Sequence, residues 1–389
     1  MPRVKAGRPG LQLGELWKGT KLTTRNELLR ESSRVSLIAA SAFAVTLCGA
    51  AGAKAEEPIK LGLSGYMEQF FGYADNDTDQ DHFDQKSDTE VEFGGETTLD
   101  NGISFGAAVV LNGNTDNEEQ IAESYAYVEG NFGRGEIGSR DNAAAIMQYA
   151  APDVGIGLND GDVSDWIENT TSSDADSAFE STFLFLGEDK ANKITYFTPR
   201  FSGVQVGVSY IPEFERDDNA QPAEDLYENG FAVGVNFVET LGEVDVALAA
   251  GFLTASAPNG GDDDAEGYSL GFNLGYAGFT VGGSYAHTEG NAGAGTDTAT
   301  SFDGNGYDIG VAYAWDSAAV SLSYLHGEVE GLVGTDGDDE NDTVMLSGSY
   351  GIGPGVDVIG SIFATEYDGD AADSSNEGWG VVTGLVLSF

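Results

Sequence analysis

The sequence predicts an all-β fold: a transmembrane, antiparallel, up-and-down β-barrel of about sixteen strands. Three observations support this fold class: apolar side chains alternate with small or polar ones along most of the chain, connections alternate between short and long, and aromatic residues gather at strand ends. The composition agrees, because 55 glycines and 11% aromatic residues occur beside only 9 prolines. No stretch approaches the roughly 20 apolar residues that a membrane-spanning helix needs, so we expect a membrane to be crossed by strands.

The N-terminal segment has the features of a secretory signal peptide. Arg30 and Arg34 precede an apolar run that ends in Ala53-Lys54-Ala55, the small-x-small pattern of a signal-peptidase site. We therefore divide the chain into a signal peptide at residues 1–55 and a β-barrel domain at residues 56–389. The part ahead of Arg30 is longer than a usual signal n-region, which indicates a start site assigned too early or an extended signal.

The single cysteine, Cys48, falls inside the proposed signal peptide. A lipid-modified cysteine is the alternative, but Leu47 stands before it where a lipoprotein signal has a small residue. A mature chain without cysteine has neither a disulfide framework nor a thiol nucleophile.

Period-two alternation of side-chain type defines the strands. Residues 307–315 are the clearest example, with aromatic or β-branched residues at odd positions and Asp, Gly or Ala at even positions. Many segments approach the roughly 9–11 residues of a membrane-barrel strand. We expect strands at residues 59–73, 88–99, 103–111, 122–131, 135–140, 193–200, 204–211, 228–239, 244–254, 267–276, 279–287, 306–315, 320–329, 343–351, 356–367 and 378–389.

The connections between these strands alternate in length. Tight turns at residues 100–102, 201–203, 277–278 and 316–319 alternate with long polar loops. Short turns on one side and long loops on the other are typical of an outer-membrane barrel. A soluble Greek-key sandwich, the main rival fold, has no reason to follow that rhythm.

Aromatic residues at the strand ends predict two girdles at the membrane interfaces. One set lies at the loop ends and the other at the turn ends of the strands. The loop-end set is Tyr73, Tyr210, Tyr285 and Tyr367, and the turn-end set is Tyr276, Trp315, Tyr350 and Phe389.

The charge is strongly negative, at −48 for the whole chain. Nine of the 17 Lys and Arg residues but only three of the 65 Asp and Glu residues precede Glu56, and no Lys or Arg follows Arg216. Binding of nucleic acid is therefore not expected, because phosphate contacts need basic side chains. Such a charge attracts cations instead.

Three segments resemble Gram-negative general porins of the sixteen-stranded trimeric type, in the style of alphaproteobacteria. They are the opening strand at residues 59–66, the strand-turn-strand at residues 91–105 and the C-terminal residues 384–389. The resemblance implies an outer-membrane diffusion channel for small hydrophilic solutes and ions, a homotrimer, and contact with outer-membrane lipid and lipopolysaccharide. Terminal Phe389 resembles the signal that the barrel-assembly machinery recognises.

The resemblance also implies that the longest connection, residues 141–192, is a third loop that folds into the barrel and narrows it. A long insertion in a compact domain is usually functional. By loop position, we assign the pore constriction to its central acids, although any one of them could instead face solvent on the outer side of the loop. They are Asp160, Asp162, Asp165, Glu168, Asp174 and Asp176.

The opposite wall departs from the family pattern, which places a basic cluster there. Arg140 is the best basic candidate for that wall. Glu92 and Glu96 share one face of the second strand with Glu90, and that face is expected to line the lumen because carboxylates facing lipid would be costly. We therefore expect a cation-selective pore.

Calcium is the one ligand that the acidic loops suggest, because carboxylate oxygens suit that ion. The spacing of the acids does not reproduce an EF-hand loop, and a solvated acidic surface is the alternative. No other cofactor is expected. The weak calcium candidates are Asp262, Asp263, Asp264, Asp336 and Asp338.

No feature of the sequence indicates an enzyme. The three histidines, His82, His287 and His326, fall in loops or near the external rim, and no Gly-rich phosphate loop joins a strand to a helix. Two other functions stay open at this point: a substrate-specific outer-membrane channel and a secreted β-rich adhesin.

Overall fold

A computed structural model describes most of the chain after residue 58. The described ranges are residues 59–78, 81–113, 120–159, 161–171, 173, 178–188, 190–214, 226–257, 264–292, 300–301, 303–331, 337–370 and 374–389. The proposed signal peptide, its cleavage site and Cys48 lie outside these ranges. Among the described residues, no helix is both long enough and apolar enough to span a membrane.

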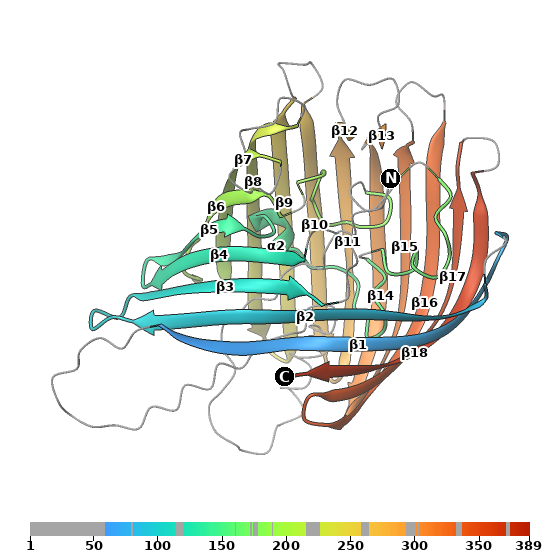
Figure 1. Ribbon diagram of the computed structural model, residues 1–389, viewed down its shortest axis with the longest axis horizontal. Helices are drawn as coiled ribbons and strands as arrows, with labels where there is room; N and C mark the ends of the chain where they lie inside the picture. Colours follow the sequence, from blue (N-terminus) through green and yellow to red (C-terminus); the bar gives the residue numbers. More distant parts are fainter. Residues whose placement is uncertain are drawn as a thin grey trace.

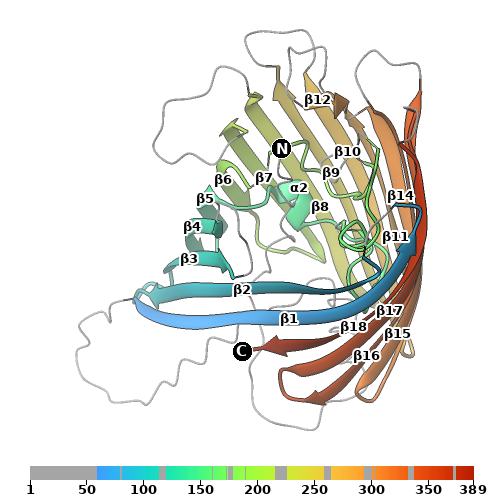
Figure 2. The ribbon, with the colours of Figure 1, turned by 45° about the vertical axis from the view of Figure 1, so that its right-hand side comes forward.

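Sixteen strands of the described chain form one closed barrel (Figures 1 and 2). Each is antiparallel to its neighbours, and the order around the barrel follows the sequence, which confirms the predicted up-and-down topology. The barrel strands are β1 (Lys60–Asn76), β2 (Phe83–Thr98), β3 (Ser104–Asn112), β4 (Ile121–Gly130), β5 (Gly133–Ser139), β6 (Asn192–Phe197), β7 (Val204–Glu213), β8 (Glu228–Leu241), β9 (Val244–Ser256), β10 (Ala265–Tyr276), β11 (Phe279–Glu289), β14 (Gly304–Trp315), β15 (Ala318–Glu330), β16 (Asp338–Gly353), β17 (Val356–Asp368) and β18 (Asn376–Ser388).

Among the described residues, three small elements lie outside the barrel sheet. Strands β12 (Asn291–Ala292) and β13 (Thr300–Ser301) pair with each other in one external connection. Helix α2 (Ala143–Ile146) begins after the Asn142 cap, whose side chain accepts hydrogen bonds from the N–H groups of Ala144 and Ala145. A side-chain oxygen at this position satisfies N–H groups that have no partner within the helix.

The barrel closes between its first and last strands. β1 pairs with β18 from Tyr66 opposite Ser388 to Asn76 opposite Gly378. Beyond the last pair, the N–H of Gly65 donates to the carbonyl of Phe389 (2.9 Å) and the N–H of Phe389 donates to the carbonyl of Gly65 (3.0 Å). The C-terminal residue therefore extends the ladder to Gly65, and residues 60–64 of β1 pair with β2 on the other side.

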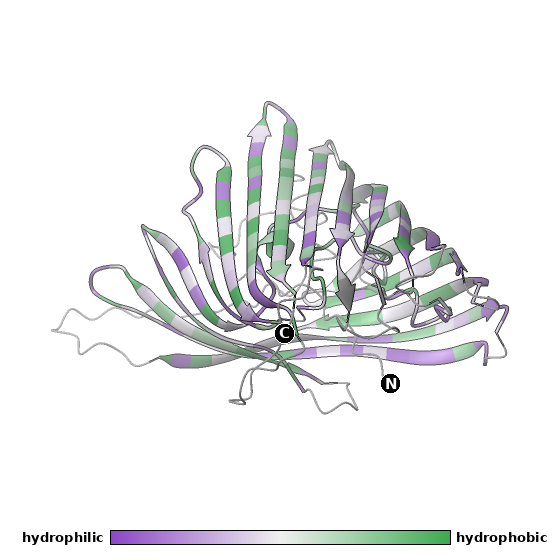
Figure 3. Ribbon diagram, turned by 90° about the horizontal axis from the view of Figure 1, so that it is seen from above, coloured by the Kyte–Doolittle hydropathy of each residue, from purple (hydrophilic) through white to green (hydrophobic). Residues whose placement is uncertain are grey.

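The outer face of the barrel is apolar across the middle of the strands. The strand register places Val311, Leu322, Leu346, Ile362 and Val381 in one row across β14 to β18. Their side chains are 38–54% exposed, although all are apolar. The same alternation of apolar and polar residues runs along the strands in Figure 3. The row has the character of a lipid-facing band.

The girdle prediction is confirmed at the turn ends and partly wrong at the loop ends. Tyr276, Trp315, Tyr350 and Phe389 are 42–56% exposed, as expected for a ring of aromatics at an interface. Tyr367, however, is only 1% exposed and stacks on Phe179 of the third loop. The reason is parity, since the outward residues of β17, such as Ile362, have even numbers.

A charge in the apolar row tests this orientation. Leu322→Arg is expected to lower the free energy of unfolding by about 2–4 kcal/mol, because a charged side chain at the depth of the hydrocarbon is poorly solvated. Glu328→Arg is the matched control on the same strand and face, near the external rim, where the cost falls to about 0–1 kcal/mol. Reversible denaturant unfolding in lipid vesicles measures both. Equal effects of the two variants would contradict the assigned depth.

Candidate functional site

The described residues of the third long connection, residues 140–191, lie inside the barrel against its inner wall (Figures 1 and 2). Its first limb forms hydrogen bonds with successive strands. The contacts are Ala143 N to Ser209 Oγ (2.9 Å), Gln148 Nε2 to Leu270 O (3.2 Å), Ala151 N to Asp308 Oδ1 (2.7 Å), Val154 N to Ser321 Oγ (3.1 Å) and Ile156 N to Ser361 Oγ (3.3 Å). The limb therefore follows the wall from β7 round to β17.

The tip of the loop and its second limb, which returns from the tip to β6, also form hydrogen bonds with the barrel wall. At the tip, Asn376 Nδ2 donates to the carbonyl of Glu168 (2.7 Å), and Ser173 Oγ donates to Asp339 Oδ2 (3.0 Å). On the way back, Asn341 Nδ2 donates to the carbonyl of Phe179 (3.0 Å). The prediction of an inward-folded third loop is thus confirmed, and the loop covers the wall rather than crossing the centre freely.

Small wall residues allow this close approach. A Cβ atom at Gly234 would collide with the carbonyl oxygen of Ala143, and a Cβ atom at Gly306 would collide with that of Ala178. Glycine at these positions lets the loop backbone lie directly on the sheet. Part of the chain's high glycine content is therefore explained by the fit between the loop and the wall.

Only some of the acids predicted to form the constriction lie among the described residues. Asp162 and Asp165 are half-buried near the loop tip, and Glu168 is exposed. Trp166, next to Asp165 in the sequence, lies against Gly72 of β1. Lys86 Nζ is 5.8 Å from the centre of the Trp166 ring. Asp160, Asp174 and Asp176 lie outside the described residues. The constriction role of all six acids stays a prediction.

The wall of β2 presents its even-numbered residues to the lumen. Lys86, which approaches the loop, has the same parity as Glu90, Glu92 and Glu96, whereas Phe93 is 41% exposed on the outer face. Tyr127 Oη of β4 donates a hydrogen bond to Glu96 Oε2 (3.0 Å). The structure therefore places the three glutamates on the lumen face, as the sequence parity predicted.

Arg140 lies at the wall but is buried at the first root of the loop, with 4% exposure. Its Nη1 is 2.6 Å from Glu136 Oε1, its Nε is 3.6 Å from Glu123 Oε2, and its guanidinium lies 4.5 Å from the ring centre of Tyr125. Burial by itself would lower the pKa of Arg140, but Tyr125 and the two carboxylates raise it above its ordinary value. Arg140 thus stays charged and anchors the first root of the loop. Among the described wall residues, no exposed basic cluster lies beside it.

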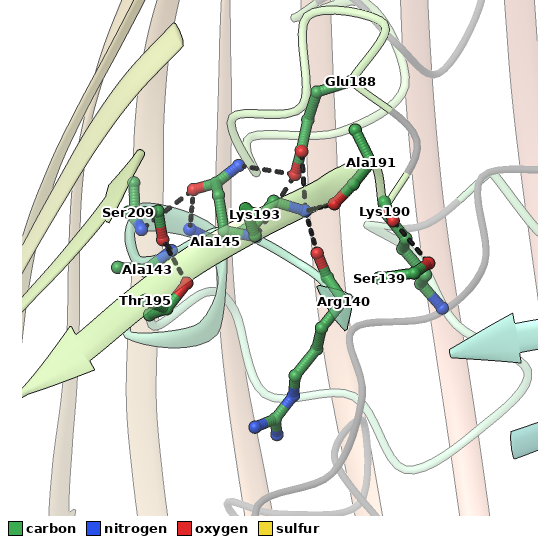
Figure 4. A network of polar contacts seen from close by, with 12 residues as sticks. Ser139, Arg140, Ala143, Ala145, Glu188, Lys190, Ala191, Lys193, Thr195 and Ser209 are labelled. Carbon is green, nitrogen blue, oxygen red and sulfur yellow. Dashed lines mark hydrogen bonds and ion pairs between the residues drawn. The ribbon is translucent and has the colours of Figure 1, made fainter. Parts of the chain in front are cut away.

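A second buried ion pair lies at the second root of the loop, and its hydrogen bonds reach the first root (Figure 4). Lys193 Nζ is 2.8 Å from Glu188 Oε2, with side-chain exposures of 2% and 0%, and it also donates to the carbonyls of Arg140 and Ala191. Glu188 Oε1 in turn accepts from Asn142 Nδ2 (3.0 Å). Burial raises the pKa of Glu188, while Lys193 opposes that change.

Sequence reasoning assigned no role to Lys193, Glu188, Glu123 or Glu136. Their signal was available: opposite charges flank both ends of the longest connection. Alternation alone could not reveal it, because Arg140 reaches Glu123 of β4, and Lys193 reaches the carbonyl of Arg140, only when the strands are paired.

The calcium candidates do not converge on a site in the part of the chain that the structure describes. No group of three or more potential metal ligands occurs among the described residues. Asp264 accepts a hydrogen bond from the N–H of Ala257 (2.8 Å), and Asp338 begins strand β16 instead of lying in a loop. Asp262, Asp263 and Asp336 lie outside the described residues, so calcium binding stays a prediction.

The three histidines belong to the aromatic belt near the external ends of the strands. Each ring packs on a tyrosine. The centroid distances are 5.4 Å for His82 with Tyr73, 5.1 Å for His287 with Tyr268 and 5.2 Å for His326 with Tyr307. His287 and His326 have the parity of outward residues on β11 and β15, away from the lumen.

Comparison with known proteins gives one family and a consistent fold. A family model described as Gram-negative porin matches residues 39–371. No curated protein matches. Among solved structures, a porin refined at 1.8 Å resolution is 17% identical, with 85% of this chain and 100% of that chain covered and a TM-score of 0.57.

Two further solved structures have the same coverage pattern. An anion-selective porin from Comamonas acidovorans is 16% identical over 85% of this chain and 100% of that chain, with a TM-score of 0.56. The trimer form of OmpT, an outer-membrane protein of Vibrio cholerae, is 13% identical over 86% of this chain and 100% of that chain, with a TM-score of 0.59. At these identities the likeness concerns the fold.

Proposed function

Because the chain belongs to the Gram-negative porin family, whose members are diffusion channels of the outer membrane, we propose that its pore passes small hydrophilic solutes and prefers cations. The family and the closed barrel exclude the secreted adhesin. The fold does not decide the sign of the selectivity, since the similar porin from Comamonas acidovorans is anion-selective. The residues that line the path must supply that property.

The observation that supports cation preference is the charge balance of the lumen wall at β2. Five carboxylates share its inward parity with a single lysine: Asp84, Asp88, Glu90, Glu92 and Glu96 against Lys86. The basic groups on this side are held by carboxylates, at 2.5 Å for Lys86 with Asp84, 2.5 Å for Arg134 with Glu136 and 2.6 Å for Arg140 with Glu136. A lumen with surplus carboxylates concentrates cations and repels anions.

The remaining properties rest on analogy. We propose a homotrimer, which the trimer form of OmpT supports by its similar fold. The outer face would contact outer-membrane lipid and lipopolysaccharide, and the C-terminal strand would carry the signal for the barrel-assembly machinery.

Solute flux into proteoliposomes tests the proposed function. Glucosamine, N-acetylglucosamine and glucuronate are small sugars that carry a positive charge, no charge and a negative charge. We expect entry in that order, with rates proportional to concentration. Fastest entry of glucuronate would contradict cation preference, and saturation at low concentration of one solute would favour a substrate-specific channel.

A matched pair of triple variants tests which carboxylates are responsible. Replacing Glu90, Glu92 and Glu96 by glutamine is expected to lower the glucosamine-to-glucuronate flux ratio by roughly two- to fivefold, because one charge at ~4 Å contributes about 1 kcal/mol in water. The control replaces Glu328, Glu340 and Glu366, which are exposed with outward parity. It makes the same change in net charge and should leave the ratio as in the wild type.

A further inference from the structure

Both limbs of the third loop meet at one buried carboxylate on the barrel wall. Asp308 of β14 is 3% exposed. Its Oδ1 accepts a hydrogen bond from the N–H of Ala151 on the first limb (2.7 Å). Its Oδ2 accepts a hydrogen bond from Thr182 Oγ1 on the second limb (3.2 Å). Oδ2 also accepts hydrogen bonds from Asn159 Nδ2 and from Ser284 Oγ of the neighbouring strand β11.

The two limbs are tied to each other at the same place. Thr182 N donates to Asn159 Oδ1 (2.7 Å), Asn159 Nδ2 donates to Thr182 Oγ1 (2.8 Å), and Ser181 Oγ donates to the carbonyl of Asn159 (3.1 Å). These bonds close a neck between Asn159 and Thr182. The described residues between them, 161–171, 173 and 178–181, are called the acidic sub-loop here, and they include Asp162, Asp165 and Glu168 of the constriction prediction.

We propose that Asp308 is the positioning residue of the constriction: it fixes the neck of the acidic sub-loop to the wall and thereby holds the sub-loop's carboxylates in the ion path. The inference rests on the proposed function. Four donors converge on this one buried carboxyl group, whose two oxygens are acceptors shared by both limbs.

Other described wall contacts have a narrower reach. Ser209, Ser321 and Ser361 bind points on the first limb, and Thr288 and Asn341 bind points on the second. Each of these side chains bonds to one limb, as Asp339 does to Ser173 near the tip. Loss of Asp308 would leave both limbs without their common acceptor, and buried donors without an acceptor are costly. The neck of the sub-loop would then move relative to the wall, while the tip keeps its contacts with Asn376 and Asp339 and the barrel strands stay paired.

Single-channel recording of Asp308→Ala and of the milder Asp308→Asn tests the proposal. We expect open-channel noise to rise several-fold, sub-conductance states to appear, and the zero-current potential in a salt gradient to move toward zero. Thermal stability of the assembled barrel should match that of the control Thr343→Val. Thr343 is also buried on the inner wall, but its side chain bonds to the strand residues Asn341 and Thr365. Quiet, wild-type currents in Asp308→Ala would overturn the proposal.

A disulfide rescue separates positioning from general destabilisation. Thr182 Oγ1 and Ser284 Oγ are 2.5 Å apart, and a disulfide joins two sulfurs at about 2.05 Å. Cysteines at both positions, in the Asp308→Ala background, would reconnect the neck to β11, in a mature chain expected to have no other cysteine. We expect quiet currents when the pair is oxidised and noisy currents after reduction. Noise that persists when crosslinking is complete would contradict the proposal.

A failure of the Asp308 proposal can be distinguished from a failure of the proposed cation preference. A wild-type channel without cation preference would refute the proposed selectivity, yet the effect of Asp308 on noise would still be measured. Conversely, a cation-selective wild type with an unaffected Asp308→Ala variant would refute only the role of Asp308.

Discussion

Deletion of Phe389 is expected to abolish assembly of the barrel in the outer membrane of a Gram-negative host. The deletion removes two backbone hydrogen bonds with Gly65 at the closing seam, which together contribute only about 1–3 kcal/mol. That loss is small beside the stability of a closed barrel. The expected effect in cells is large because the terminal aromatic ring, 54% exposed on the outer face, is proposed to be the recognised part of the assembly signal.

Phe389→Ala separates recognition from stability, because it keeps both backbone hydrogen bonds. We expect it to assemble as poorly as the deletion in cells while refolding into detergent like the wild type. Phe389→Tyr, which keeps an aromatic ring, should assemble. Heat-modifiable mobility of the outer-membrane fraction measures each case, and normal assembly of Phe389→Ala would contradict the role of the ring.

Lys193→Met is expected to lower the free energy of unfolding by about 3–5 kcal/mol, the usual cost of removing one partner of a buried ion pair. Glu188 would stay fully buried without its cation at 2.8 Å. Two backbone carbonyls at the loop roots, those of Arg140 and Ala191, would also lose their donor. The two ends of the third loop would then separate more readily.

The loss of unfolding free energy in Lys193→Met should depend on pH. Burial raises the pKa of Glu188 even in the intact protein, and removal of Lys193 takes away the group that opposes this change. A carboxyl with a raised folded-state pKa destabilises the fold above its unfolded pKa, and the penalty disappears as the pH falls to that value. The variant should therefore be closest to wild-type stability in acid.

The double variant Lys193→Met with Glu188→Gln provides the control, because it removes both charges and keeps the shape of the acceptor. It should recover part of the stability at neutral pH and lose the pH dependence. Denaturant unfolding at two pH values measures all three proteins. A double variant less stable than Lys193→Met would contradict a buried, uncompensated charge as the cause.

The strands could be predicted from the sequence because the lipid band enforces alternation, but their external ends could not. β16 begins at Asp338 rather than at residue 343, and β2 begins at Phe83 rather than at residue 88. Above the lipid, strand pairing continues through backbone hydrogen bonds without an apolar face. The acidic stretch at residues 338–342 therefore looks like a loop in sequence, although it pairs with β15 and β17.

The site could be predicted only in outline. The length of the third loop and the parity of Glu90, Glu92 and Glu96 indicated a lumen with surplus acid. The junction at Asp308 left no sequence signal beyond a polar residue at an inward position. Its donors, at residues 151, 159, 182 and 284, come together only because the loop follows the wall to β14.

The zero-current potential of the purified protein in a planar bilayer with a potassium chloride gradient tests the central claim most directly. The acidic lumen predicts a potential whose sign reports potassium as the more permeant ion, in channels that insert in steps of three if the trimer is correct. A potential of the opposite sign would contradict the acidic path as the source of selectivity, and the absence of conductance would contradict the channel itself.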